Sequence, residues 1–374
     1  MDSRDTKVTE AFFALLKAGL WEKEIRIEPY LPVDLQAVYE LANNQSVVGP
    51  LAAGLEHVTD RKIVKTEAVP FLKKVIKMEN RNASMDAFVK ELARRLGDAG
   101  IPFLLLKGQG IARCYTRPQW RYCGDVDLLF SDKNFEKAKA FFRPLVKYFD
   151  PDNDFTRHIS TTLGSFELEL HADQHPGLSY RIDNAVDRIL ARCLEGGEVR
   201  VWDDGGTPVM LPSPDNDVIL VFTHILKHFY KGGIGLRQLC DLSRLLWTYR
   251  ESIDRNLLGE RLREMRLMTE WKAFGYYCVN YLGMPSEAMP YYEESRRWAR
   301  KAQRINRFIL KVGTFGINRD SSYYQKYPFL IRKSISLLRR LSDLLHHGTI
   351  FPLNSLRFLP RTVFGGLESA VNGQ

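Results

Sequence analysis

Two aspartates separated by one residue are the first side chains in this sequence that could do chemistry. Asp125 and Asp127 open the segment Asp125-Val-Asp-Leu-Leu-Phe130, an apolar run that is typical of a buried strand. Alternate residues of a strand point to the same face, so both carboxylates project together while Val126 turns into the core. Such oxygens are the ligands that Mg²⁺ or Mn²⁺ prefers. We interpret the pair as the start of a metal site; the alternative is a solvated strand end that caps the turn after Gly124.

A glycine-containing turn precedes these aspartates. The apolar run 102–106 predicts a short buried strand, and Lys107-Gly-Gln-Gly110 follows it directly. Small residues let backbone N–H groups approach a phosphate, and the start of the next helix adds the positive end of its dipole. We expect Lys107, Gly108, Gln109 and Gly110 to bind nucleotide phosphates, with a surface lysine as the alternative for Lys107. The segment lacks the Gly-x-x-x-x-Gly-Lys-Ser/Thr pattern of a Walker loop.

A third acid is offered by a later strand. Residues 165–172 alternate in polarity, which places the acids and one histidine on a common face: Glu167, Glu169 and His171. A carboxylate on a neighbouring strand would complete a two-metal site, in which one ion activates a hydroxyl and the other steadies a leaving pyrophosphate. Glu169 is the favoured third acid and Glu167 the alternative. His171 is interpreted as a substrate contact or a support for the ligands; it would equally suit a histidine that only satisfies a neighbour.

Further polar residues are candidates for the same site. Arg121, shortly before the aspartates, either binds a triphosphate or pairs with an aspartate that keeps the metal site in shape. His224 and His228 have i, i+4 spacing, which can bind metal, but no third ligand is evident. A helix face that lines the active cleft, or a pair of core histidines, is favoured instead. Arg237 and Asp241 have the same spacing and are expected first as a helix-stabilising pair, with a nucleotide contact as the alternative.

The elements that must position these residues predict an α+β fold. Strand patterns near 102–106, 125–130, 156–163 and 165–172, with short segments at 199–202 and 209–211, predict a small mixed sheet. A helix predicted from residue 133 should kink or end at Pro144. We divide the chain into an N-terminal helical region (1–98), an α/β core (99–212), a C-terminal helical domain (213–348) and an extended tail (349–374).

Composition excludes several classes of protein. The apolar fraction of 45% and the charged fraction of 26% are those of a globular protein. We expect no transmembrane helix, because no stretch approaches the length that spans a bilayer, and no secretory signal. The 5 cysteines are scattered and never form a Cys-x-x-Cys pair, which favours free thiols in a cytoplasmic protein.

Positive charge is concentrated toward the C-terminus. Of the net charge of +9, much comes from 296–340, where Asp320 is the one acid among many basic residues, Arg319 and Lys326 included. This block suits a phosphate-rich partner or a solvated helix face. Ile331, Ile335, Leu338, Leu341 and Leu345 form an apolar stripe there. We expect the stripe to pack against the helical domain, with weak membrane-surface association as the alternative.

The order of these motifs resembles the DNA polymerase β-like nucleotidyltransferase superfamily, in which a glycine turn precedes Asp-x-Asp and a third acid follows. Within it, the chain is most similar to the bacterial family of uncharacterised nucleotidyltransferases. The resemblance rests on Lys107-Gly108, Ile111-Ala112, Arg121 to Leu129, Glu169-Leu-His171, His224 and Asp241-Leu242, over roughly residues 85–250. One departure is Gln109, which stands where the superfamily usually has a second small residue, Ser or Gly, in the turn.

The resemblance implies a metal-dependent transferase that moves a nucleoside monophosphate from an NTP such as ATP to an acceptor hydroxyl. It implies Asp125, Asp127 and Glu169 as catalytic metal ligands for Mg²⁺ or Mn²⁺. The acceptor stays open among a small molecule, a glycan precursor and a protein. Two alternatives remain: a non-catalytic nucleotide-sensing protein on the same fold, and a transferase that modifies nucleic acid through the basic block, which is less favoured because no RNA-binding module is recognisable.

Overall fold

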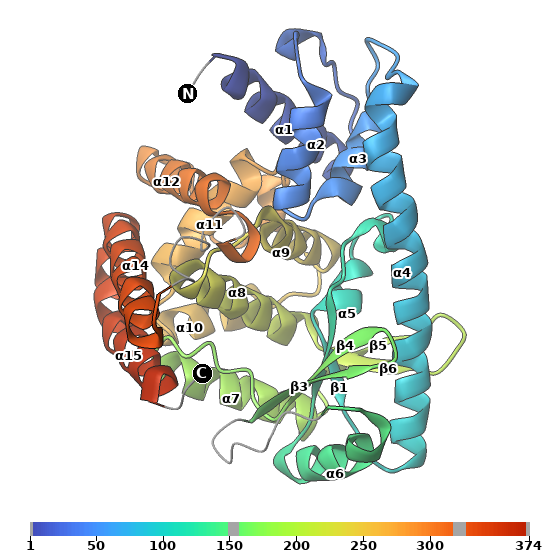
Figure 1. The fold of residues 1–374 in the computed structure, drawn as a ribbon, viewed down its shortest axis with the longest axis vertical. Coiled ribbons are helices and arrows are strands. Elements are labelled where there is room, and N and C mark those ends of the chain that lie inside the picture. Colours follow the sequence, from blue (N-terminus) through green and yellow to red (C-terminus); the bar gives the residue numbers. More distant parts are fainter. Residues whose placement is uncertain (1–2, 149–156, 317–326, 372–374) are drawn as a thin grey trace.

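A computed structural model describes residues 3–148, 157–316 and 327–371 of the chain. Its longest element is the helix α4 (Lys65–Asp98), which runs along one side of the molecule from the N-terminal helices to the sheet (Figure 1). Helices from the C-terminal half lie on the opposite side of the sheet from α4. The α+β fold class expected from the sequence is therefore confirmed.

The central sheet has four strands in the order β1-β2-β4-β3. They are β1 (Leu104–Leu106), β2 (Asp125–Leu129), β3 (His158–Leu163) and β4 (Phe166–His171). Strands β2 and β4 run parallel, whereas β1 and β3 are antiparallel to their neighbours. In the β2–β4 register, Asp127 lies beside Glu169 and Asp125 beside Glu167, so alternation along both strands brings all the predicted acids to one face.

The other face of the sheet is buried against helices. Met85, Val89 and Leu92 of α4 share a hydrophobic cluster with Val126 and Leu128 of β2. Helix α6 (Asp132–Phe142) covers the same cluster and passes into the 3₁₀ helix η3 (Arg143–Leu145). The early end predicted at Pro144 is confirmed, because a proline ring within a helix displaces the preceding turn. Residue 156, the predicted start of the β3 segment, lies outside the described residues.

Two strands predicted to complete the mixed sheet form a separate hairpin, so that part of the prediction is wrong. Strands β5 (Val199–Trp202) and β6 (Val209–Pro212) pair only with each other, in a register of four residue pairs. Val209 and Leu211 nevertheless belong to the hydrophobic cluster of the central sheet. Side-chain packing, and not a shared hydrogen-bond ladder, thus joins the hairpin to the core, which strand-like periodicity alone cannot distinguish.

The N-terminal and C-terminal helices share one hydrophobic core. The N-terminal elements are α1 (Ser3–Trp21), η1 (Glu28–Tyr30), α2 (Leu35–Asn44) and α3 (Val48–Glu56), with α5 (Gly108–Ala112) and η2 (Pro118–Trp120) following α4. The later ones are α7 (Tyr180–Leu194), α8 (Pro214–Lys231), α9 (Leu236–Thr248), α10 (Arg255–Glu264), α11 (Met268–Asn280), η4 (Ser286–Ala288), α12 (Arg296–Val312) and η5 (Thr314–Gly316). Phe13 contacts Tyr281 edge-on, and the indole N–H of Trp21 donates to the Leu282 carbonyl at 2.6 Å. Regions that are far apart in sequence, before residue 98 and after 213, are therefore one packed body.

The tail predicted to be extended from residue 349 is instead helical. Helix α14 (Phe329–Ile350) is followed directly by α15 (Pro352–Val371). Pro352 does not interrupt a helix here, because it stands at the first helical position, where no intrahelical N–H bond is lost. The buried side chains of Phe351 and Phe358 anchor this end of the chain in the helical core.

The C-terminal basic block is described in part. The exposed residues of α12 include Arg296, Arg297, Arg300, Arg304 and Arg307. Arg319, Asp320 and Lys326 lie outside the described residues. The predicted apolar stripe of α14 is not buried as a unit, because Ile331 and Leu345 are exposed whereas the adjacent Leu344 is buried. No helix within the described ranges is long and apolar enough to cross a membrane.

A buried glutamate in α11 should give the stability of the protein a measurable pH dependence. Glu270 is 1% exposed and accepts a hydrogen bond from the Asn354 side chain of α15 at 2.7 Å. Burial raises the pKa of Glu270 to about 7. Between the pKa of an unfolded glutamate and this value, the folded state holds a proton that the unfolded state has released, so the free energy of unfolding falls as pH rises.

We expect Glu270→Gln to remove this contribution, of order 3 kcal/mol in all. The variant should gain stability over the wild type as pH rises from 5 to 8. Urea unfolding at several pH values measures the difference. A difference that does not change with pH would contradict the assignment.

Candidate active site

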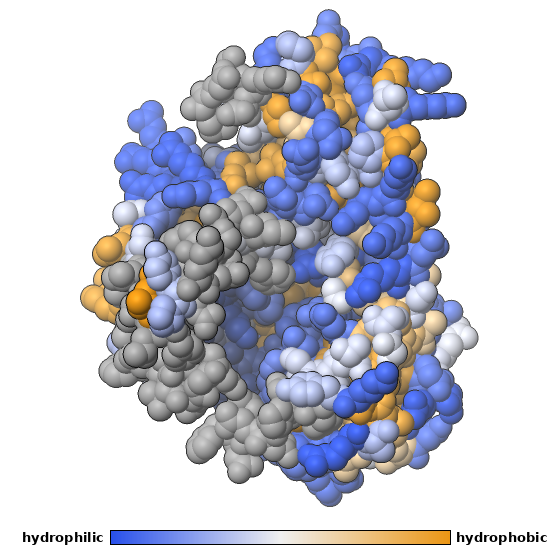
Figure 2. Space-filling view, viewed as in Figure 1, coloured by the Kyte–Doolittle hydropathy of each residue, from blue (hydrophilic) through white to orange (hydrophobic). Residues whose placement is uncertain are grey.

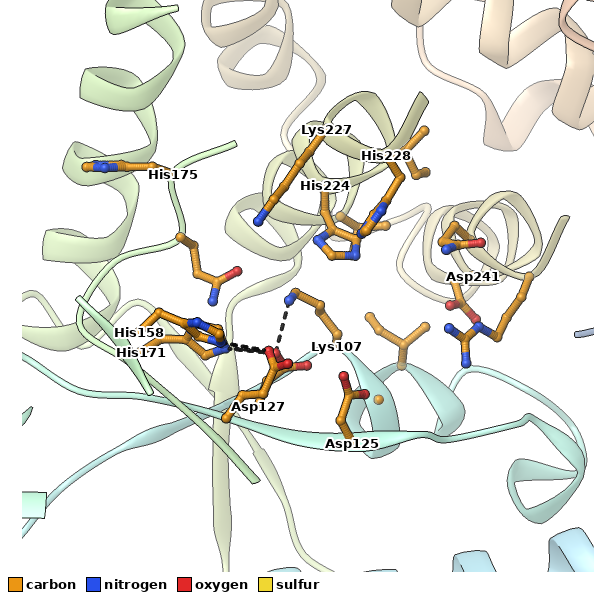
Figure 3. Close-up of a pocket in the computed structure, with 18 of the residues that line it drawn as sticks. Lys107, Asp125, Asp127, His158, His171, His175, His224, Lys227, His228 and Asp241 are labelled. Atoms are coloured by element: carbon orange, nitrogen blue, oxygen red, sulfur yellow. Dashed lines mark hydrogen bonds and ion pairs between the residues drawn. The ribbon is translucent and has the colours of Figure 1, made fainter. Parts of the chain in front are cut away.

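A cavity of about 560 Å³ opens on the polar face of the sheet. Its walls come from β2, β3 and β4 on one side and from α8 and α9 on the other, and Figure 3 shows the side chains of both walls pointing toward one another. The volume lies within the range of small-molecule binding pockets. The molecular surface is hollowed between the C-terminal helices and the sheet, and the walls visible there are hydrophilic (Figure 2).

Three carboxylates meet in this cavity. Asp125, Asp127 and Glu169 each offer an oxygen, and these oxygens lie within 4.8 Å of one another. Asp127 is buried, whereas Asp125 and Glu169 are half-buried. Burial, together with the neighbouring Asp127 and Glu169 carboxylates, raises the pKa of Asp125. Glu167 is exposed, which makes Glu169 the acid that the fold brings to this group.

Asp127 is the centre of a hydrogen-bond network. Its Oδ1 accepts from Lys107 Nζ at 3.1 Å and faces His171 Nε2 at 2.9 Å (Figure 3). Burial by itself would raise the pKa of Asp127, but the Lys107 ammonium and the His171 imidazole outweigh it and lower that pKa. In turn, burial of His171 is outweighed by hydrogen bonds to Asp127 and Glu169, and the pKa of His171 is raised. The carboxylate is thus held ionised by the Lys107 ammonium and by its hydrogen bond with His171.

Glu169 has its own pair of histidines. His158 Nε2 lies 3.2 Å and His171 Nε2 3.3 Å from Glu169 Oε2. The hydrogen bonds to His158 and then His171 lower the pKa of Glu169, so this carboxylate also stays ionised. The two imidazole rings stack, with centroids 4.6 Å apart.

The turn that carries Lys107 has an unusual backbone. Lys107 has φ 51° and ψ −130°, a conformation that residues with a side chain rarely adopt and that carries strain of order 1–3 kcal/mol. Gly108 follows with φ 29°. The turn directs the Lys107 ammonium to Asp127 across the β1–β2 pair, where it forms the 3.1 Å hydrogen bond.

Only the first half of the predicted phosphate turn reaches the cavity. Lys107 and Gly108 line it. Gln109 is buried and its side-chain amide contacts the Met85 sulfur, while a Cβ on Gly110 would meet Leu211 at 2.7 Å. Gln109 and Gly110 therefore face the packing between α5, α4 and the hairpin, because a helix beginning at Gly108 turns the next residues away from the sheet edge.

Helix α4 secures the segment that leads into β2. Asn82 donates from its side-chain amide to the carbonyls of Gln119 and Arg121, each at 2.8 Å. Arg81 donates to the carbonyl of Gly124 at 2.9 Å. The backbone immediately before Asp125 is therefore fixed by side chains of a long helix, which orients the first carboxylate.

Arg121 pairs with an aspartate of α9. Its guanidinium makes two bonds to Asp241, Nε to Oδ1 at 3.1 Å and Nη2 to Oδ2 at 2.6 Å. Tyr115 donates its hydroxyl to the same carboxylate at 2.8 Å. Asp241 thus pairs with Arg121, and not with Arg237 as the helical spacing suggested. Of the two roles considered for Arg121, the geometry supports the one that keeps the site in shape, because its guanidinium is already bound to a carboxylate.

The wall opposite the carboxylates is basic. Helix α8 contributes His224, Lys227 and His228, and α9 contributes Arg237. Burial is the first cause that lowers the pKa of all four, followed by the positive charge of Lys107 for Lys227 and His224, of Lys227 for His228, and of Arg121 for Arg237. Arg237 Nε is buried with no hydrogen-bond acceptor among the described residues. The lowered pKa values leave His224 and His228 neutral at neutral pH, so the positive charge of this wall comes from Lys227 and Arg237. An anionic ligand would stabilise these two partly desolvated cations.

Several lining residues were not predicted as site residues. The polar and charged ones are His158, Asp173, Gln174, His175, Lys227 and Gln238. Lys227 had a usable signal, since it lies three residues after His224 on a helix expected to line a cleft, and residues three apart share a helix face. His158 alternates with the buried Ile159 and so belongs to the outward face of β3. Its approach to Glu169 depends on strand order, which the sequence does not state.

Comparisons with known proteins place the chain in a family. A solved structure of an antigenic nucleotidyltransferase-like protein from Paracoccidioides brasiliensis is similar over 53% of this chain and 91% of that chain, with 15% sequence identity and a TM-score of 0.31, a likeness too small to interpret further. No curated protein matches the sequence. The family described as uncharacterised nucleotidyltransferase has a sequence model that matches residues 32–283, more than half of the chain. The chain therefore belongs to the family of uncharacterised nucleotidyltransferases.

Proposed function

We propose that this protein transfers a nucleoside monophosphate from an NTP to an acceptor hydroxyl and releases pyrophosphate, on a fold of the DNA polymerase β-like superfamily. The observation that carries the proposal is the division of one cavity into an acidic wall and a basic wall. Asp125, Asp127 and Glu169 lie on the sheet, and Lys227 and Arg237 face them from α8 and α9. A triphosphate with its divalent ions needs both kinds of surface.

The three carboxylates fit Mg²⁺ or Mn²⁺. Their oxygens converge within 4.8 Å, and hard oxygen donors are the ligands that these ions take. Asp125 and Asp127 would hold the ions in common, and Glu169 would complete the acceptor side. When bound, the ions would neutralise the phosphates and lower the pKa of the attacking hydroxyl.

In the proposed reaction the acceptor oxygen attacks the α-phosphorus and forms a new P–O bond. The bond between the α-phosphorus and the oxygen that bridges it to the β-phosphorus breaks. The hydroxyl proton passes to a carboxylate of the acidic wall, and Glu169 is the one that lies against both His158 and His171, which could take the proton further. Pyrophosphate carries the leaving negative charge. Lys107 and Lys227 would bind the β- and γ-phosphates, and Arg237 would donate its buried Nε–H to the same oxygens.

The proposal is tested by titrating the full chain with a non-hydrolysable NTP, with and without Mg²⁺, and by following label from α-labelled NTPs into a pool of acceptors. Wild-type protein should bind the nucleotide in a Mg²⁺-dependent manner and transfer label. The double variant Asp125→Ala/Asp127→Ala should do neither. Equal nucleotide binding by the wild type and the double variant would contradict the metal-site assignment. Nucleotide binding by the wild type without transfer to any acceptor would favour a nucleotide-sensing protein.

The basic wall makes a separate prediction. We expect Lys227→Gln to weaken NTP binding about 10-fold or more, because a charge-assisted hydrogen bond to phosphate contributes about 1.5–3 kcal/mol. Calorimetric titration with the same analogue gives the affinity. Lys231→Gln is the matched control, since Lys231 is an exposed lysine one turn later on α8 and does not line the cavity. If both variants bind as the wild type does, the phosphates do not lie against α8.

A further inference from the structure

Two histidines and one carboxylate form a second group that could bind a cation, beside the three carboxylates. His158, Glu169 and His171 offer ligand atoms that all lie within 4.8 Å of one another. His158 comes from β3 and the other two from β4, so adjacent antiparallel strands present the group. In Figure 3 the rings of His158 and His171 lie side by side and point toward Asp127.

The distances in this group are those of ligands around one ion. The two Nε2 atoms lie 3.2 Å and 3.3 Å from Glu169 Oε2. Ligands bound at about 2.0–2.2 Å to a four- or six-coordinate ion lie about 3.0–3.4 Å apart.

Hydrogen bonds alone satisfy this arrangement poorly. His171 Nε2 faces two carboxylate oxygens, Asp127 Oδ1 and Glu169 Oε2, yet a ring nitrogen carries a single proton and can donate it well to one acceptor only. His158 Nε2 is aimed at the same Glu169 oxygen. A cation among these atoms would bind both imidazoles through their lone pairs and the Glu169 carboxylate at once.

We propose that His158, His171 and Glu169 form a cation site for a first-row transition ion such as Mn²⁺, Co²⁺ or Zn²⁺. Two imidazole nitrogens and a carboxylate oxygen are a ligand set that suits these ions, whereas Mg²⁺ takes oxygen ligands almost exclusively. The site differs from the proposed carboxylate set in its nitrogens, and shares Glu169 with it. Its occupancy does not require nucleotidyl transfer.

Pulsed EPR of Mn²⁺ bound to the full chain without nucleotide tests the site directly. Wild-type protein should show ¹⁴N coupling from directly bound imidazole, and the coupling should be lost in His158→Gln/His171→Gln. His175→Gln is the matched control, because His175 lines the same cavity but pairs with Asp187, and its variant should keep the coupling. Bound Mn²⁺ without ¹⁴N coupling in the wild type would overturn the proposal and leave the histidines as supports for Glu169.

Ion selectivity provides a second measurement, which needs only a single variant and so remains possible if the double variant folds poorly. His158 has a half-exposed side chain, so His158→Gln should leave the core intact. We expect it to weaken Co²⁺ binding at least about 10-fold, as loss of one first-row metal ligand does, with a smaller effect on Mg²⁺. An equal change for both ions would contradict nitrogen ligation.

The test also separates this inference from the proposed function. Asp125 belongs to the carboxylate set alone. Asp125→Asn should therefore lose Mg²⁺-dependent NTP binding and keep the ¹⁴N-coupled Mn²⁺ signal. Loss of ¹⁴N coupling in Asp125→Asn would show that a single shared ion site exists, which would overturn the second site while leaving the transferase proposal standing.

Discussion

Replacing Asp125 with asparagine is expected to lower the affinity for a Mg²⁺-bound NTP analogue at least about 100-fold, because the variant loses one of the carboxylates that neutralise the ion. Isothermal titration with the non-hydrolysable analogue measures this directly. Asparagine has nearly the same shape as aspartate, and Asp125 is half-buried at the start of β2, so the fold should persist.

The same variant should be more stable than the wild type when no ion is bound. Burial and the neighbouring Asp127 and Glu169 raise the pKa of Asp125, so its ionised form is disfavoured in the folded state. The pKa of Asp125 is higher in the folded than in the unfolded state, so the free energy of unfolding falls as pH rises through the folded pKa. At neutral pH the folded wild type holds an ionised Asp125 at a cost, and asparagine removes this cost. Urea unfolding at neutral pH without metal should therefore give a higher free energy of unfolding for Asp125→Asn than for the wild type.

Glu167→Gln is the control for both measurements. Glu167 lies opposite Asp125 in the β2–β4 register but is exposed and does not line the cavity. We expect its affinity and stability to match the wild type. If Asp125→Asn binds the analogue as tightly as Glu167→Gln does, Asp125 is no metal ligand.

The second large effect concerns stability. Breaking the Arg121–Asp241 pair by Arg121→Met should lower the free energy of unfolding by about 3–5 kcal/mol, because it leaves a buried carboxylate without its cation. Both side chains are only 7% exposed, so solvent screens the pair very little. Burial would lower the pKa of Arg121, but the Asp241 carboxylate more than offsets it and raises that pKa.

A double-mutant cycle separates the pair from its surroundings. Asp241→Asn removes the charge but keeps an oxygen that accepts from the Tyr115 hydroxyl. The double variant Arg121→Met/Asp241→Asn should lose less stability than the two single variants together, since neither charge is then buried alone. Strict additivity in urea unfolding would mean that the two groups do not stabilise each other.

The strand face on which the site acids lie was predictable, because the local alternation of residues along a strand determines it. Strand alternation places Asp125 with Asp127, and likewise Glu169 with His171, on a common face whatever the rest of the fold does. The end of α6 near Pro144 follows equally from one residue's geometry. Helical periodicity identified α8 and the face that carries His224 and His228.

Other features depended on which segments meet. The tail from residue 349 is helical because Phe351 and Phe358 pack in an apolar core. Pro352 suits the first helical position, whereas Pro360 lies inside α15, where a proline by itself disfavours a helix. Strands β5 and β6 have ordinary strand patterns, and only packing places them outside the central sheet. Arg237 and Asp241 have the spacing of a helical pair, but Arg121 offers a bidentate partner that i, i+4 geometry does not.

By itself, the sequence determined the residue types of the site and the faces on which they lie, since both follow from the period of a strand or a helix. Tertiary structure alone decided their distances. The parallel β2–β4 register sets Asp127 beside Glu169, β3 brings His158 to the same carboxylate, and α8 turns Lys227 toward them. These juxtapositions arise from strand order and helix packing, which minimise exposed apolar surface over the whole chain and leave no local pattern in the sequence.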